Sequence, residues 1–209
     1  MATNVFGHAE DLNYTHFGGV PYYANCGMRA VMPENGKVLN IKLYLGKNAT
    51  TNSTAWGVIW DRNTGGILAM SDSQQITNTA TNGITGLLIY TFPFNGTPRI
   101  AKDTPLWIGY GKASNISGHS LRFGTDNTAP GFYIDSNDTT QSSPGTMSAT
   151  RTWNDEALWV EVVYETGGEI KVWNGSSFVS KPAKSWNGSS WNSKVVKTWN
   201  GSSWNESKS

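Results

Sequence analysis

Aromatic side chains near the C-terminal end of the chain are spaced for binding chemistry. They bracket three copies of Asn-Gly-Ser-Ser in the last 37 residues, at Trp173 and Phe178, Trp186 and Trp191, and Trp199 and Trp204, each copy thirteen residues after the previous one. Aromatic rings stack on the apolar faces of sugar rings, while asparagine and serine supply hydrogen bonds. We therefore take these six aromatic residues as candidate binding residues.

Basic side chains accumulate in the same segment. Residues 169–209 carry six lysines and two glutamates, whereas residues 1–168 carry ten Lys and Arg against thirteen Asp and Glu. The candidate basic residues are Lys181, Lys184, Lys194 and Lys197. The interpretation that we favour is that they keep an exposed aromatic segment soluble. The alternative is contact with an anionic polymer, such as a cell-wall phosphodiester or a nucleic acid.

The rest of the chain lacks the residue patterns of common enzymes. His8, His16 and His119 lie far apart without zinc-ligand spacing, and neither a Gly-x-Ser-x-Gly turn nor a phosphate-binding glycine loop occurs. Glu161 and Glu165 could act as the paired carboxylates of a glycosidase, but strand alternation places Glu161 on a solvent face. We expect no catalytic residue, no cofactor and no enzymatic activity.

Two further groups have simple structural interpretations. Cys26 is the only cysteine, so an internal disulfide is impossible and a buried thiol is expected. Four oxygen-bearing residues gather in predicted loops, namely Asp126, Asp135, Asn137 and Asp138. They lack a regular ligand spacing, so we interpret them as turn residues, and the alternative of a calcium site stays open.

The tail repeats predict small β-hairpins. Asn-Gly is the dipeptide that most readily takes the two left-handed conformations of a tight hairpin turn. The aromatic residues on either side of Asn-Gly-Ser-Ser would then face each other across the two strands. A single hairpin of this size is marginal in water, so it needs support from neighbouring copies, a symmetry-related chain or a ligand.

The first part of the chain predicts an all-β domain. Residues 1–36 are turn-rich and aromatic, and no stretch has the period of a long helix. Short strands separated by turn residues are expected over residues 38–45, 55–60, 67–71, 86–94, 106–110, 119–123, 131–134 and 158–164. Such a series is typical of a sandwich or a barrel. No apolar run is long enough for a membrane helix and no secretory signal follows Met1, so we expect synthesis in a cytoplasm.

The order of these motifs resembles a known family of domains. The segments 36–46, 57–61, 65–69 and 104–110 together are similar to the jelly-roll domains that recur in bacteriophage tail fibres and other surface-attached bacterial and viral proteins. The resemblance covers about residues 17–165. It implies a jelly-roll-like antiparallel β-sandwich over residues 1–167, followed by a short β-hairpin repeat tail over residues 168–209, with the boundary at Gly167-Gly168.

The tail adds a second resemblance. The run from Lys171 to Gly188 is similar to the Trp-Asn-Gly-Ser repeats at the C-termini of minor tail proteins of phages that infect Gram-positive and mycolate-coated bacteria. This resemblance implies a virion protein. We expect a tail or tail-fibre accessory protein that attaches to the host surface by binding carbohydrate, and the alternative is a capsid decoration or head-fibre protein.

The same resemblance sets the expected partners. They are other virion proteins, a host envelope glycan and further copies of the chain in a homotrimer, and we expect neither a membrane nor a nucleic acid among them. A third function, an envelope-glycan hydrolase, is disfavoured because no catalytic constellation was found.

Overall fold

The structure is a computed structural model that describes part of the 209-residue chain. The described residues are 3–8, 16–20, 25–47, 53–80, 86–96, 98–112, 121–126, 132–135, 144–148, 151–153, 157–166, 170–181, 184–193, 197–199 and 204–206. Within them, side chains are described except at 16–20, 121–126, 132–135, 151–153, 157, 170–172, 178–181, 193, 197–199 and 204–206. These residues form strands, turns and short connections without a helix, and none of their segments is a helix that could cross a membrane.

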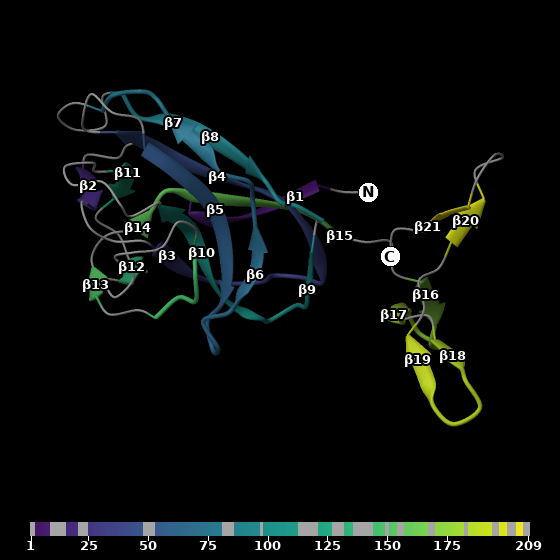
Figure 1. The fold of residues 1–209 in the computed structure, drawn as a ribbon. Helices are drawn as coiled ribbons and strands as arrows, with labels where there is room; N and C mark the ends of the chain where they lie inside the picture. The colour runs from purple at the N-terminus through teal and green to yellow at the C-terminus, as the bar shows by residue number, and fades with distance from the viewer. Residues whose placement is uncertain are drawn as a thin grey trace.

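The described residues between 3 and 166 form an antiparallel β-sandwich of two sheets, which confirms the predicted all-β sandwich class. The first sheet is built around the long strand β4 (Figure 1). It contains β1 (Thr3–His8), β2 (His16–Val20), β4 (Gly36–Lys47), β8 (Leu88–Pro93), β9 (Arg99–Ile100), β11 (Leu121–Asp126), β14 (Ala157–Leu158) and β15 (Val160–Thr166). Along most of its length, β4 pairs with β15 on one side and with β8 and β9 on the other.

The second sheet is centred on β10, which lies between β3 and β5. It contains β3 (Asn25–Val31), β5 (Ser53–Asp61), β6 (Ile67–Met70), β7 (Gln74–Ile76), β10 (Pro105–Lys112), β12 (Phe132–Asp135) and β13 (Arg151–Trp153). An isolated antiparallel bridge between Ser71 and Phe94 joins the two sheets at one edge, without closing them into a barrel.

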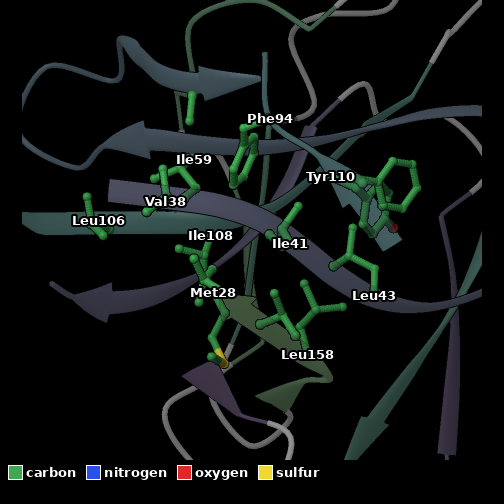
Figure 2. Packing of buried hydrophobic residues seen from close by; sticks show 14 of the residues in the cluster. Met28, Val38, Ile41, Leu43, Ile59, Phe94, Leu106, Ile108, Tyr110 and Leu158 are labelled. Atoms are coloured by element: carbon green, nitrogen blue, oxygen red, sulfur yellow. The ribbon is translucent and has the colours of Figure 1, made fainter. Parts of the chain in front are cut away.

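The core lies between the sheets and is made by alternating side chains. On β4, Val38, Ile41 and Leu43 point inward, and a bulge in the pairing with β15 resets the alternation after Val38. They belong to one buried cluster with residues such as Ile59 on β5 and Ile108 on β10. Figure 2 shows part of this cluster, with side chains from both sheets filling the space between the ribbons. Apolar packing of this kind replaces the disulfides that the chain cannot form.

The N-terminal segment is where the sequence prediction was wrong. Residues 1–36 were described as turn-rich and no strand was predicted in them, yet β1, β2 and β3 lie there, and β3 is an interior strand of the second sheet between β10 and β12. The strands β7, β9 and β13 were also missed. The predicted strands over 38–45, 55–60, 67–71, 86–94, 106–110, 131–134 and 158–164 overlap β4, β5, β6, β8, β10, β12 and β15, respectively. Of the prediction over 119–123, residues 119–120 lie outside the described residues and 121–123 begin β11.

The tail forms three separate two-stranded sheets. They consist of β16 (Ile170–Trp173) with β17 (Phe178–Lys181), β18 (Lys184–Trp186) with β19 (Trp191–Ser193), and β20 (Lys197–Trp199) with β21 (Trp204–Glu206). None of these described strands joins a sheet of the sandwich, whose last strand ends at Thr166 (Figure 1). The predicted hairpin repeats are therefore confirmed as local units.

Candidate functional site

Each tail hairpin places its two aromatic residues directly opposite each other. The registers pair Trp173 with Phe178, Trp186 with Trp191, and Trp199 with Trp204. Each pair is the last one before the loop, so the Asn-Gly-Ser-Ser tetrapeptide forms the whole connection. The sequence repeat thus becomes a repeat of aromatic cross-strand pairs, as predicted.

The asparagine side chain organises the loop in the first two hairpins. The Asn187 Oδ1 atom accepts hydrogen bonds from the backbone N–H groups of Ser189 (2.9 Å) and Ser190 (2.8 Å) and from the Ser189 hydroxyl (3.1 Å). The Asn187 N–H also donates to the Ser190 carbonyl oxygen at 3.1 Å. The Asn174 loop repeats this arrangement, with its Oδ1 atom 2.9 Å from the N atoms of residues 176 and 177. Both loops are therefore closed by the same side chain.

This geometry corrects the predicted turn. The prediction gave left-handed conformations to both Asn and Gly, but in the first two loops only the glycine has positive φ, 103° at Gly175 and 101° at Gly188. A four-residue loop needs a single left-handed residue, and the asparagine is left free to act as a hydrogen-bond acceptor. Serine at the third and fourth loop positions supplies the donors.

The described tryptophans of the tail are open to solvent. Trp173, Trp186 and Trp191 are 55%, 54% and 64% exposed, respectively. The rings of Trp186 and Trp191 contact each other with centroids 5.6 Å apart and an interplanar angle of 54°. The side chains of Phe178, Trp199 and Trp204 lie outside the described residues, although their backbone pairing is described. The Trp186–Trp191 pair is thus a fixed, exposed aromatic surface at the end of a hairpin.

Three of the four predicted basic residues lie on described strands of the tail. Lys184 is exposed on β18, and its strand partner is Ser193. Lys181 and Lys197 occupy strand positions opposite Ile170 and Glu206, with their side chains outside the description. Lys194 lies outside the described residues. Only Lys184 can therefore be placed beside an aromatic pair from its side chain.

The candidate carboxylates of the sandwich do not form an acid and base pair. Glu161 on β15 lies opposite Lys42 on β4, and the Lys42 Nζ atom is 2.6 Å from Glu161 Oε1. Both side chains are partly exposed on the outer face of the first sheet, as the alternation predicted for Glu161. Glu165 lies near the other end of β15, opposite Lys37. A carboxylate that faces an ammonium group across two strands is a common stabilising pair of a solvated sheet face.

The remaining titratable candidates that are described, Cys26, His8 and His16, lie on three different strands. Cys26 is buried in the core, and this burial raises the pKa of its thiol to about 12, so the thiolate nucleophile is disfavoured. His8 and His16 lie on β1 and β2, and His119 is outside the described residues. Among the described residues no group of three or more His, Cys, Asp or Glu side chains could hold a metal ion.

Two of the four candidate calcium ligands lie at the ends of described strands. Asp126 ends β11 and Asp135 ends β12, and these two strands belong to different sheets. Asn137 and Asp138, the other two residues of that group, lie outside the described residues.

The described tryptophans of the sandwich pack within it. Trp60, Trp107 and Trp159 are buried, and Trp56 is partly buried against the second cluster. The side chain of Trp153 is outside the description. Trp60 and Trp107 lie on the outer face of the second sheet, where residues 144–148 cover them, and Trp60 Nε1 donates to the Gly145 carbonyl oxygen at 2.9 Å. The guanidinium of Arg29 lies 5.6 Å from the Trp107 ring centroid.

The sequence prediction missed a set of buried polar residues at one end of the sandwich. Asn25 begins β3, Ser53 begins β5, Lys47 ends β4 and Lys112 ends β10, and all four are buried. Burial lowers the pKa of Lys112 to about 8. Among the described residues, neither polar atom of the Asn25 amide has a hydrogen-bond partner. No spacing in the sequence marks these residues as buried.

Comparisons with known proteins add no family assignment. No protein-family model matches the chain, and a search of curated proteins finds no significant match.

Proposed function

We propose that the chain is a non-catalytic accessory protein of a bacteriophage virion, in the tail or a tail fibre, that attaches to carbohydrate on the host surface. The observation that supports this proposal best is the exposed Trp186–Trp191 pair on a hairpin whose sequence recurs three times. Aromatic faces beside amide and hydroxyl groups are suited to pyranose rings. The virion location rests on the resemblance of the repeats to those of minor tail proteins.

The two parts of the chain have different roles in this proposal. The sandwich is a packed body that carries the tail and contacts other virion proteins. The tail hairpins are the binding elements, because the tail tryptophans whose side chains are described, Trp173, Trp186 and Trp191, are exposed. A homotrimer would multiply the sites and raise avidity. Light scattering of the purified chain tests the trimer, and a monomer at all accessible concentrations would contradict it.

The location is tested on the particle itself. Labelled antibodies against the sandwich should mark the tail of intact particles, with a handful to tens of copies per particle by quantitative mass spectrometry. Labelling of the capsid with hundreds of copies would instead support the alternative, a decoration or head-fibre protein.

The attachment function is tested with the purified chain. It should bind envelope preparations of the host and compete with particle adsorption. The triple variant Trp173→Ala, Trp186→Ala, Trp199→Ala should lose this binding while the sandwich keeps its thermal transition. Binding that survives the triple substitution would remove the tail aromatic pairs from the function.

A further inference from the structure

Each tail repeat carries a lysine at one fixed position before its aromatic pair. Lys171 precedes Trp173 by two residues, Lys184 precedes Trp186 and Lys197 precedes Trp199, so the full repeat reads Lys-x-Trp-Asn-Gly-Ser-Ser followed by Phe or Trp. All three lysines lie in the first strand of their hairpin, in β16, β18 and β20. The conserved spacing within the chain points to a role that needs both side chains.

Strand geometry puts this lysine beside the aromatic pair. Residues two apart on a strand share a face and are separated by about 7 Å. In the second hairpin, Lys184 and Trp186 are both exposed, and Trp191 lies opposite Trp186. The resulting surface has an ammonium group next to two indole rings, on the side away from the loop.

The positive charge of the hairpins indicates which kind of ligand this surface can attract. Residues 170–193, which form the first two hairpins, contain three lysines and no Asp or Glu. A second copy of these hairpins would bring like charges together, which opposes self-association at this surface. A ligand with negative groups would be attracted, and a ligand with sugar rings would also use the indole faces.

We infer that each of the first two hairpins, in which the lysine lies opposite a serine, is one binding module for an acidic polysaccharide. The aromatic pair stacks on a sugar ring, and the lysine two residues earlier pairs with a carboxylate or phosphate group on the same or the next sugar. The thirteen-residue repeat sets these two modules in series, so one polymer can engage both at once. This inference rests on the proposed attachment function and specifies its ligand as acidic.

The test compares two sets of lysines in the full chain. The first variant is Lys171→Gln, Lys184→Gln, and the matched control is Lys181→Gln, Lys194→Gln, which removes the same charge elsewhere in the tail. The probes are alginate, a polymer of carboxylated sugars, dextran, a neutral polymer of sugars, and polyphosphate, an anionic polymer without sugars. Binding is measured by biolayer interferometry at two salt concentrations.

The unchanged chain should bind alginate more tightly than dextran or polyphosphate. The first variant should lose about tenfold or more in alginate affinity, because each module loses a charge-assisted contact, and the control should lose about threefold or less. The loss for alginate in the first variant should also exceed its loss for dextran. The two-dimensional NMR signals of Gly175 and Gly188 report that the hairpins remain folded.

Three results would overturn the inference. Equal losses in the two lysine variants, or polyphosphate binding as tight as alginate binding, would indicate general attraction between a basic tail and polyanions. Binding of dextran as tightly as alginate would indicate a neutral glycan, and the attachment function would stand without the acidic ligand. Failure of the unchanged chain to bind any of these glycans or the host envelope would instead count against the attachment function itself.

Discussion

Trp60 on β5 and Trp186 on β18 have the same side chain but lie in different structural surroundings. Trp60 lies on the outer face of a sheet, yet it is buried, because residues 144–148 form a further layer over it and accept its indole hydrogen bond. Trp186 lies on a two-stranded hairpin, where its described contact is the facing ring of Trp191. A tryptophan on a sheet is thus structural when a covering segment reaches it, and is available for binding when only its own hairpin supports it.

The largest loss of stability is expected when the buried tryptophan is removed. Trp60→Ala deletes a fully buried ring and leaves the Gly145 carbonyl oxygen without its donor. We expect the free energy of unfolding of the sandwich to fall by about 3 to 5 kcal/mol. Chemical denaturation followed by tryptophan fluorescence measures the loss, with Trp186→Ala as the matched control. A loss in the control as large as that in Trp60→Ala would mean that the tail tryptophan is also structural.

The same contrast shows how far the sequence could predict the fold. β4 and β5 were predictable because their apolar residues either alternate or run continuously. β3 was not, because it begins with Asn25 and contains Gly27, both poor strand formers, and it becomes a strand by pairing with β10 and β12. Tertiary pairing of this kind leaves no local signal.

The candidate site was predictable to a similar extent. The hairpins and the opposed aromatic residues follow from a repeat that is local in sequence. The loop geometry was mistaken because Asn-Gly alone indicates a two-residue turn, whereas the two serines that follow provide the donors for a wider loop around the Asn187 oxygen. The burial of Trp60 depends on Gly145, which is 85 residues away, so no local pattern could have indicated it.

A buried lysine of the sandwich and an exposed lysine of the tail should affect the pH dependence of stability differently. Lys112 is buried in the sandwich, and burial lowers its pKa from 10.5 to about 8, whereas Lys184 in the tail is exposed. Between pH 8 and 10.5 the unfolded chain still binds a proton at Lys112 that the folded chain has released, so this residue makes unfolding less favourable as pH rises. Over that window we expect Lys112 to raise the free energy of unfolding by on the order of 2 kcal/mol.

The measurement is denaturation at several pH values between 7 and 11, with and without Lys112→Met. The difference in unfolding free energy between the two proteins should change with pH only across the window given by the two pKa values. Lys184→Met is the control, and the difference in its unfolding free energy from the unchanged chain should not vary with pH over this window. A constant difference for Lys112→Met would show that its ammonium group is solvated in the folded sandwich.

A smaller effect is expected at the outer face of the first sheet. Glu161→Gln keeps the size of the side chain and removes the charge that faces Lys42 across β15 and β4. Because the pair is partly exposed, we expect the free energy of unfolding to fall by about 1 kcal/mol or less, and less still at high salt. Thermal denaturation at two salt concentrations measures it. Loss of glycan binding in this variant would contradict the assignment of binding to the tail.

The smallest expected effect comes from the largest deletion. The described strands of the sandwich end at Thr166 and those of the tail begin at Ile170, and the tail sheets contain no sandwich strand. Removal of all residues after Gly167 should therefore leave a soluble fragment whose cooperative thermal transition is within about 2 °C of that of the full chain. Differential scanning calorimetry measures both transitions, and the fragment should no longer bind host envelopes. An insoluble fragment, or one without a cooperative transition, would mean that the tail supports the sandwich, and the exposed tryptophans would then need a structural explanation as well.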